Sequence, residues 1–328
     1  MKTIIQTIIF IMVILIAVPL ALGILFGSSK NTASEGEEIK NKIETPDTIK
    51  VWMSESGNIE EIDFEDYIAC VVASEMPAAF EEEALKAQSV AARTYAMAKI
   101  LKYDEKRPEN HPEAPVCDTT HCQAYKTKER LIEIHDRGWE KTGFDKVKKA
   151  CKETEGQMLY YEGELVMQPL FFSSSGGKTE NSQDVFVGAY PYLVSVSSPY
   201  EQEATHSNEK KKFTFECIEQ SLSGAYPDRP TGEITAENIK ILSRTKGGRV
   251  ADMQVGNAIF KGTEIRSALG LSSALFSIEF ETENNVIFTS DGSGHGVGLS
   301  QYGASGMAKN GSDYKEILTH YYTGTKVY

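Results

Sequence analysis

An uncharged apolar run near the N-terminus constrains this 328-residue chain most strongly. Residues 7–27 carry no charge, and at about 1.5 Å per residue they can cross about 30 Å of hydrocarbon. Residues 28–48 are polar and cannot bury a core. We therefore expect a cytoplasmic stub with one transmembrane helix (1–27), a flexible linker (28–48) and a folded extracytoplasmic domain (49–328).

A cleaved signal peptide is the alternative interpretation of this run. Ala21-Leu22-Gly23 has the small-x-small pattern of a cleavage site. The apolar residues continue through Ile24, Leu25 and Phe26, which favours an uncleaved anchor. We therefore expect a single-pass protein of the cell membrane whose folded part lies outside the cytoplasm, as does its substrate.

The charge balance argues against nucleic acid as a partner. The chain has 34 Lys+Arg and 47 Asp+Glu, a net charge of −13, and its longest basic block is Lys210–Lys212. A protein that binds phosphates needs a larger basic surface. Five cysteines are too few for a disulfide scaffold and odd in number, so metal binding stays open.

Mixed periodicity predicts an α+β fold, with helices packed on a mostly antiparallel sheet and 205–285 as a second lobe beside a cleft. Helices are expected from Asp63 to the residues before Pro77, and over 84–101, 215–222, 236–242 and 314–321. Strands are expected over 49–52, 157–161, 166–172, 250–255, 276–281 and 286–289.

Glu75 is the first candidate functional residue. Three- and four-residue steps from Phe64 to Val72 place it on the apolar stripe of the first helix. Burial disfavours a charged carboxylate, so its pKa should rise, as a general acid near neutrality requires. The alternative is a structural Glu75 bonded to backbone or paired with Lys86 or Arg93.

A Pro-rich loop offers a candidate zinc site. Two thiols and two imidazoles within twelve residues can supply four tetrahedral ligands: His111, Cys117, His121 and Cys122. A Cys117–Cys122 disulfide and no bond at all are the alternatives, and His135 could replace His111. The remaining cysteines lie in helical patterns and are expected to be small buried hydrophobes: Cys70, Cys151 and Cys217.

The glycine-rich segment 292–303 is the third candidate. Its polar side chains could contact a ligand along a close-fitting backbone: His295, Ser300, Gln301 and Tyr302. The serine nucleophile motif would need glycine at 302, and the dinucleotide motif would need glycine at 301. On its own, the segment is best interpreted as a glycine-rich turn.

Three segments together resemble the SpoIID/LytB family: YIACVVASEMPAAFEEEALKAQSVAARTYA (67–96), FFSSSGGKTENSQDVFVGAYPYLVSV (171–196) and GHGVGLSQYGASGMAKNG (294–311). Segments 247–256 and 260–276 also match, so the resemblance covers about residues 48–328 in the same order.

The resemblance implies a peptidoglycan lytic transglycosylase that acts during forespore engulfment, in the space between the mother-cell and forespore membranes. Such enzymes cleave the bond between N-acetylmuramic acid and N-acetylglucosamine in glycan strands, here preferring strands without stem peptides. The expected partners are a SpoIIP-like amidase and a SpoIIM-like membrane scaffold.

The resemblance also suggests roles for individual residues. The family's catalytic glutamate falls on Glu75, which would act alone where a glycoside hydrolase uses two carboxylates. Lys86, Gln88 and Arg93 could orient Glu75 or the sugars. Residues expected to line the glycan-binding cleft are Ser173, Ser174, Ser175, Gly176, Gly177, His295, Ser300, Gln301 and Tyr302. Some similar proteins carry a metal near the groove, which supports a structural zinc.

Two other functions remain open. Related LytB proteins enhance an amidase without being the catalyst, which would make this chain a glycan-binding regulator. A zinc-dependent wall hydrolase is less favoured, because four protein ligands leave no open position on the metal.

Overall fold

The structure is a computed structural model that describes residue 39 and residues 42–282 and 284–328. The predicted anchor, and all of the predicted linker except residues 39 and 42–48, lie outside the described residues. Within the described part of the chain, we find no helix that is long and apolar enough to span a membrane. Residues 42–328 form one structural unit.

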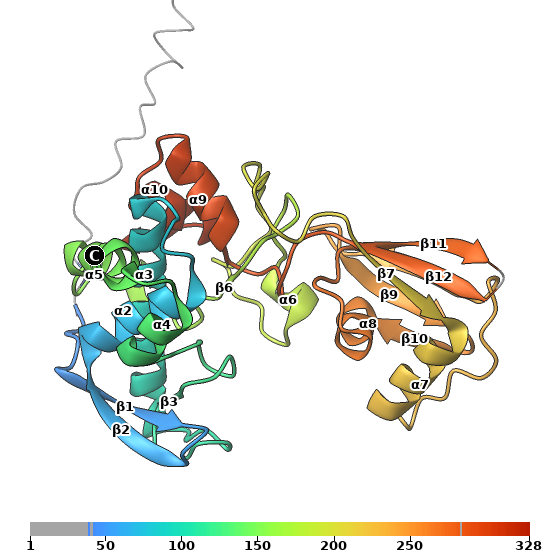
Figure 1. Cartoon of the computed structure of the whole chain (residues 1–328), viewed down its shortest axis with the longest axis horizontal. Coiled ribbons are helices and arrows are strands. Elements are labelled where there is room, and N and C mark those ends of the chain that lie inside the picture. The colour runs from blue at the N-terminus through green and yellow to red at the C-terminus, as the bar shows by residue number, and fades with distance from the viewer. Residues whose placement is uncertain (1–38, 40–41, 283) are drawn as a thin grey trace, which may run out of the picture. The chain divides into compact units, whose positions relative to one another are not determined.

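The mixture of helices and small sheets confirms the α+β class (Figure 1). The helices are α2 (Phe64–Glu75), α3 (Glu82–Tyr103), α4 (Lys128–Ile134), the π-helical η1 (Glu140–Phe144), α5 (Asp145–Glu153), α6 (Ser182–Val185), α7 (Phe215–Ala225), α8 (Gly262–Leu269), α9 (Gln301–Lys309) and α10 (Tyr314–Tyr321). The strands are β1 (Thr48–Met53), β2 (Asn58–Asp63), β3 (Val116–Cys117), β4 (Leu159–Tyr161), β5 (Glu164–Leu165), β6 (Phe171–Phe172), β7 (Glu209–Thr214), β8 (Ile239–Arg244), β9 (Val250–Val255), β10 (Ala258–Lys261), β11 (Phe276–Thr282), β12 (Asn285–Ser290), β13 (Leu299–Ser300) and β14 (Thr325–Val327).

The expected single sheet is replaced by five small ones. Their strand orders are β2-β1-β3, β10-β9-β8, β11-β12-β7, β13-β6 and β14-β4-β5. Pairing is mostly antiparallel, as predicted, but β3 runs parallel to β1 and β13 runs parallel to β6. Of the predicted strand 166–172, Phe171–Phe172 form the strand β6, which pairs with β13, and residues 166–170 lie between the β4–β5 pairing and this one.

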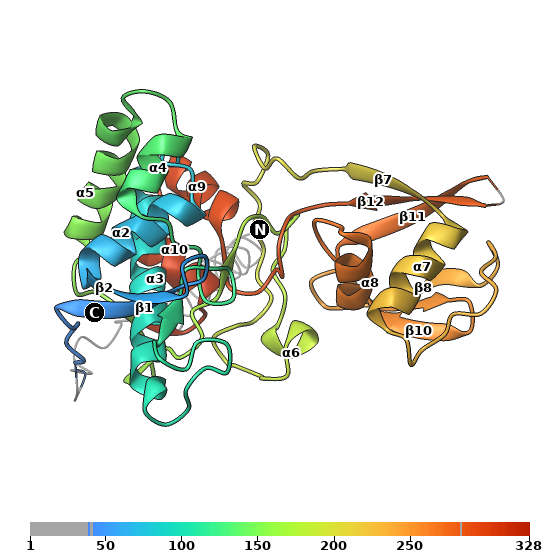
Figure 2. The same cartoon turned by 60° about the horizontal axis from the view of Figure 1, so that its bottom comes forward.

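Helix α3 is the centre of the helical part, where it contacts α2, α5, α9 and α10 (Figure 2). Its alanines at 84, 87, 91 and 92 are fully buried, which allows neighbouring elements to approach closely. Helix α2 starts at the N-cap Asp63, whose side chain accepts a hydrogen bond from the Asp66 amide (3.0 Å). It ends before Met76, which is extended because Pro77 follows.

Residues 209–290 contain a hydrophobic core of their own. Helices α7 and α8 contribute to it together with two antiparallel sheets. The predicted helix at 236–242 is wrong: Asn238 bonds the backbone at Thr235 and Glu233 in a turn, and β8 follows, paired with β9. Cys217 is exposed, contrary to prediction, whereas Cys70 and Cys151 are buried as expected. The reason is that α7 buries a different face, formed by Phe215, Ile218 and Leu222.

Helix α9 occupies a segment that the sequence presented as a glycine-rich turn. Ser300 caps it by accepting a hydrogen bond from the Gly303 amide (3.2 Å). A Cβ on Gly303 would lie 2.0 Å from the Tyr321 hydroxyl, and one on Gly306 would lie 2.0 Å from the Tyr200 carbonyl oxygen. The glycines therefore serve close packing within a helix.

Candidate active site

Glu75 is the last residue of α2, where the chain turns out of the helix. Its Oε1 accepts a hydrogen bond from the backbone N–H of Ala124 (2.6 Å). Its Oε2 accepts a longer one from the side-chain amide of Gln301 (3.4 Å). Both donors are neutral, and neither Lys86 nor Arg93 contacts the carboxylate in the structure.

Burial raises the pKa of Glu75. The hydrogen bonds from Ala124 and Gln301 and the charge of Lys126 oppose this rise without cancelling it. Glu75 is therefore a half-buried carboxyl group that holds its proton to higher pH than an ordinary glutamate. That is the property expected of a general acid.

Glu75 opens into a pocket of about 570 Å³. The lining residues are Glu75, Tyr95, Thr120, His121, Cys122, Gln123, Leu170, Phe171, Phe172, Ser173, Phe186, Arg266, Gly294 and His295. Among these described residues, Glu75 supplies the one carboxylate. The lining combines aromatic and aliphatic side chains with a similar number of polar ones, so the pocket can hold a ligand that has both apolar and polar groups.

His295 lies in this pocket as a neutral imidazole. Its Nε2 donates to the carbonyl of Phe171 (3.0 Å), while its Nδ1 accepts from the amide of Val297 (3.1 Å). Burial lowers its pKa to about 4. Its ring also packs against Phe172 and Phe186, so its nitrogens hold the local backbone and its ring completes the wall.

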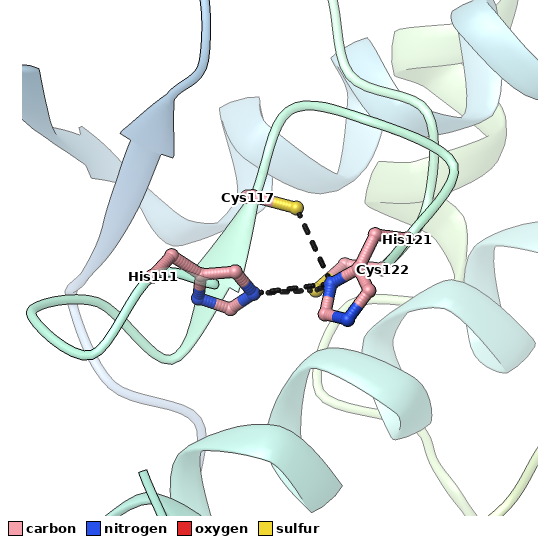
Figure 3. Close-up of side chains that lie close together, drawn as sticks. All are labelled: His111, Cys117, His121 and Cys122. Atoms are coloured by element: carbon pink, nitrogen blue, oxygen red, sulfur yellow. Dashed lines mark hydrogen bonds between the residues drawn. The ribbon is translucent and has the colours of Figure 1, made fainter. Parts of the chain in front are cut away.

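The four predicted zinc ligands converge on one point (Figure 3). Their ligand atoms all lie within 4.8 Å of one another: those of His111, Cys117, His121 and Cys122. The Nε2 of His111 is 3.3 Å from the Nδ1 of His121 and 3.4 Å from the Sγ of Cys122. Both sulfur atoms are 3.7 Å from that Nδ1.

These separations suit a tetrahedral zinc ion. With Zn–N near 2.0 Å and Zn–S near 2.3 Å, a tetrahedron separates two nitrogens by about 3.3 Å and nitrogen from sulfur by about 3.5 Å. The Nδ1–H of His111 donates to the carbonyl of Ala114 (2.8 Å), which leaves Nε2 free to ligate. The hydrogen bond between the two thiols lowers the pKa of Cys117 and raises the pKa of Cys122, so this pair favours one thiolate, at Cys117.

Two of the alternatives for this loop, the disulfide and a ligand role for His135, are not found. All five cysteines are free, so Cys117 and Cys122 form no disulfide. His135 does not replace His111, because its Nδ1 donates to the Leu131 carbonyl (2.7 Å) and its ring stacks on Trp139 at 3.8 Å.

The chain that follows the Cys/His loop donates a hydrogen bond to Glu75. Ala124, the donor to Glu75, follows Cys122 by two residues, and the intervening Gln123 donates to the hydroxyl of the buried Tyr67 (3.1 Å). His121 and Cys122 also line the Glu75 pocket. The candidate metal ligands and the candidate acid are therefore parts of one site.

Arg93 is a core residue, contrary to its predicted place beside the substrate. It is 0% exposed, and its Nε and Nη2 form a bidentate pair with Glu65 at 2.7 and 2.6 Å. It also donates to the carbonyls of Gln157 and Cys151. A guanidinium with these partners is satisfied without a ligand.

Lys86 and Gln88 also lie outside the Glu75 pocket. Lys86 forms ion pairs with Glu83 (2.8 Å) and Glu153 (2.7 Å). Gln88 is fully buried, and its amide has no hydrogen-bond partner among the described residues. The structure therefore gives neither residue a contact with Glu75.

The predicted groove segment Ser173–Gly177 divides into two parts. Ser173 lines the pocket, whereas Ser174 and Ser175 are fully buried, so their predicted groove role is wrong. The amides of Ser175 and Gly176 donate to Glu201 (2.9 Å each at the closest), and that of Gly177 donates to the Ser175 hydroxyl. These groups hold the loop together.

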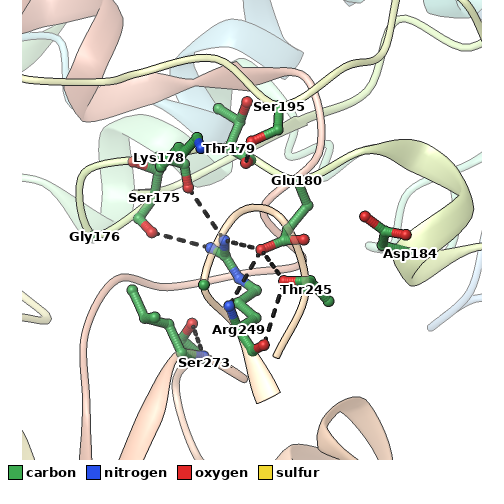
Figure 4. A network of polar contacts seen from close by, with 12 residues as sticks. Ser175, Gly176, Lys178, Thr179, Glu180, Asp184, Ser195, Thr245, Arg249 and Ser273 are labelled. Atoms are coloured by element: carbon green, nitrogen blue, oxygen red, sulfur yellow. Dashed lines mark hydrogen bonds and ion pairs between the residues drawn. The ribbon is translucent and has the colours of Figure 1, made fainter. Parts of the chain in front are cut away.

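The carbonyl of Ser175 also accepts a hydrogen bond from a buried arginine, Arg249 (3.1 Å; Figure 4). Arg249 pairs with Glu180 (3.4 Å) and donates to the carbonyl of Lys178. The two charged residues are 2% and 0% exposed, and the Thr245 hydroxyl donates to Glu180 (2.8 Å). This network ties the 175–180 loop to the turn before β9.

Residues 300–302 contact the site through α9. Gln301 reaches Glu75, as described above. The amide of Tyr302 donates to the Ser173 carbonyl (3.0 Å), and its ring packs on Phe80 at 4.9 Å between centroids. Ser300 donates to Glu201 and caps the helix, so it supports the loop.

Several pocket residues carried no sequence signal of their own. Arg266 lies on α8, Phe186 follows α6 and Tyr95 lies on α3. The contribution of Ala124 is a backbone N–H, which no residue type reveals. The position of Ala124 directly after the Cys/His loop was the one available indication.

Comparison with known proteins places this geometry in a family. The SpoIID family model, described as stage II sporulation protein, matches residues 53–161. The stage II sporulation protein D of Bacillus subtilis is 35% identical over 96% of this chain and 92% of its own length. That of Bacillus amyloliquefaciens is 36% identical over 87% of this chain and 79% of its own length.

A more distant relative has a different name. The amidase enhancer of Bacillus subtilis is 29% identical over 78% of this chain but only 39% of its own length. The high coverage by the two stage II proteins decides between them: the chain belongs to the SpoIID family of stage II sporulation proteins.

Proposed function

We propose that this chain is a peptidoglycan lytic transglycosylase in which Glu75 is both acid and base. The substrate is a glycan strand of alternating N-acetylmuramic acid and N-acetylglucosamine. The reaction breaks the bond from the muramic acid anomeric carbon and leaves an anhydro ring at the new end.

Glu75 would act twice in one turnover. As a neutral acid it gives its proton to the leaving glycosidic oxygen, and as a carboxylate it takes the proton of the muramyl 6-hydroxyl. That hydroxyl attacks the anomeric carbon of its own ring, so one C–O bond forms as another breaks and no water is consumed. Ala124 and Gln301 supply the hydrogen bonds that orient the carboxylate between the two steps.

The single carboxylate of the pocket carries this proposal. Hydrolases of glycosidic bonds normally need a second carboxylate, as nucleophile or as base for water, about 5–10 Å from the first. Glu75 has no such partner among the described pocket residues. A reaction whose nucleophile belongs to the substrate needs only one.

Product analysis tests the proposal. Full-length wild type, Glu75→Gln and the control Glu60→Gln, whose carboxylate is exposed on β2, are incubated with peptide-free glycan strands. Mass spectrometry then counts anhydro ends, which are one water lighter than hydrolysed ends. We expect anhydro ends from wild type and control, and a rate lower by about 10²–10⁴-fold for Glu75→Gln. Hydrolysed ends, or equal rates, would contradict it.

We also propose that His111, Cys117, His121 and Cys122 hold a structural zinc ion. The ion would fix the loop from which Ala124 bonds Glu75, and it would complete one wall of the pocket. Four protein ligands leave no coordination position for a reacting water.

Metal analysis of Cys117→Ser/Cys122→Ser tests the ligand set. The double variant should lose stoichiometric zinc and melt at a lower temperature, because structural zinc contributes directly to folding. Cys217→Ser is the matched control, since that thiol is exposed and distant in the chain. If the double variant retained stoichiometric zinc, Cys117 and Cys122 would not be the zinc ligands.

A non-catalytic enhancer of an amidase is the second candidate function, favoured by the similarity to the amidase enhancer. The same experiment separates the two. A wild-type protein that binds glycan and stimulates an amidase, yet yields no anhydro ends, would be an enhancer.

The proposal includes a cellular setting. An anchor at residues 7–27 would hold the domain on the outer side of the membrane, in the space between mother cell and forespore. A SpoIIP-like amidase would supply peptide-free strands, and a SpoIIM-like membrane protein would hold the two enzymes together. Protease added to intact cells should digest residues 49–328 if this orientation is correct.

A further inference from the structure

Arg266 is a cation in the Glu75 pocket without a counter-ion. It lies on α8, and its Nε donates to the Ser272 carbonyl at 3.1 Å. Neither of its Nη atoms has a hydrogen bond or ion pair within the described ranges. Its side chain is half-buried and lines the pocket together with Glu75 and His295.

This arrangement differs from that of the two buried arginines, Arg93 and Arg249. Arg93 is paired with Glu65, and Arg249 with Glu180. Burial lowers the pKa of Arg266, and no neighbouring carboxylate offsets this effect. An unpaired charge beside apolar walls is unfavourable, so the pocket is suited to a ligand that brings a negative charge.

Among the described pocket residues, no carboxylate contacts Arg266. Glu75 is bonded by Ala124 and Gln301, and His295 is neutral at pH 7. The pocket lining includes several apolar and aromatic side chains: Tyr95, Leu170, Phe171, Phe172 and Phe186. Such walls lower the local dielectric constant and strengthen a charge pair formed there.

The neighbouring pocket has the same charge character. Its volume is about 820 Å³, and it shares Phe186 with the Glu75 pocket. Its lining includes Arg244, Lys246 and Lys261 against one carboxylate, Asp184, although Lys261 is paired with Asp252. In a chain with a net charge of −13, this local excess of cations favours an anionic polymer that extends beyond one pocket.

We propose that Arg266 binds the free lactyl carboxylate of an N-acetylmuramic acid ring, which makes the pocket selective for glycan without peptide at that ring. The inference rests on the proposed function. The lactyl group carries a carboxylate when free, but a neutral and bulkier amide when a peptide is attached. Since Nε is engaged with Ser272, the two Nη atoms are the donors for a bidentate contact.

Binding measurements test the inference apart from catalysis. The full chain with Glu75→Gln, which should not cleave, is titrated with fluorescent glycan strands of one length. One set has free lactyl carboxylates and the other has them converted to methylamides. We expect the first set to bind about 10- to 100-fold more tightly, and Arg266→Gln to remove that difference by weakening only the first.

Two further variants complete the test. Arg266→Lys keeps the charge without the bidentate geometry and should retain part of the preference. If Arg266→Gln fails to fold, the Arg266→Lys variant still allows the comparison to be made. Arg130→Gln removes an exposed positive charge on α4 and should change nothing. Equal preference in the parent and in both Arg266 variants, or none in the parent, would overturn the inference.

The outcomes separate this inference from the proposed function. Carboxylate-dependent binding through Arg266 without anhydro products would retain the anion site and remove the transglycosylase. Anhydro products from a wild-type protein that binds both strand types equally would retain the transglycosylase activity and remove the anion site.

Discussion

Two parts of the same folded unit contain charged side chains that are removed from solvent. In one part the charges are paired with each other, and in the other part they are not. In the network of Figure 4, Glu180 and Arg249 pair with each other, and backbone carbonyls and Thr245 add hydrogen bonds, while the Oε2 of Glu180 and the Nε of Arg249 have no partner among the described residues. In the pocket, both hydrogen-bond donors that the described residues give Glu75 are neutral, and the Arg266 side chain bonds one described group, the Ser272 carbonyl.

This difference in pairing distinguishes charged residues that stabilise the fold from those that can act on a substrate. A paired buried charge is stable as it stands and fixes the chain around it. An unpaired buried charge has a shifted pKa, or it has donor or acceptor groups that are free to interact with a bound substrate. By this criterion the conspicuous Arg93 is structural, whereas Glu75 and Arg266 are the groups free to act.

Breaking the structural pair should have the largest effect on stability. Arg249→Met leaves Glu180 buried without its cation, which should cost about 3–5 kcal/mol of unfolding free energy. Denaturant unfolding measures the loss. Arg130→Gln, whose ion pair with Glu133 is exposed, should change stability by less than about 0.5 kcal/mol. If Arg249→Met lost under about 1 kcal/mol, the network would not be the structural region described here.

Removing the carboxyl group of Glu75 should have a much smaller effect on stability than removing Arg249. Because burial raises the folded-state pKa of Glu75 above its unfolded value, its neutral form favours folding at low pH. That contribution is lost as the pH rises from the unfolded-state pKa through the folded-state pKa. At pH 7, Glu75→Gln should therefore be as stable as wild type, or more stable by less than about 1 kcal/mol.

Unfolding curves at pH 4 and pH 7 check this expectation. The wild type should lose stability relative to Glu75→Gln between the two values. A variant that is strongly destabilised at pH 7 would show that Glu75 is a paired structural charge like Glu180, and the comparison would fail.

Local sequence signals predicted part of the site. The apolar spacing in α2 and the Pro77 break located Glu75 at a buried helix end, and the Cys/His spacing identified four residues that do converge. The ends of α10 were also predicted correctly. Each of these features depends on residues close in the chain.

Features that depend on distant residues could not be predicted. Arg93 meets Glu65 from another helix, and Ser175 meets Arg249 across 74 positions. Helix α9 was missed because its glycines suit contacts with Tyr321 and Tyr200 that only the fold reveals. That the two Nη atoms of Arg266 have no partner among the described residues is likewise a property of the folded chain.

The most direct test of the account is a titration of the Glu75 carboxyl group. Carbon NMR of protein labelled at glutamate side chains, with Glu75→Gln to assign the signal, gives its pKa in the folded chain. The account predicts a midpoint above about 4.3, the ordinary value for glutamate. A midpoint at or below that value would mean that Glu75 is a stabilised carboxylate and not the acid of this site.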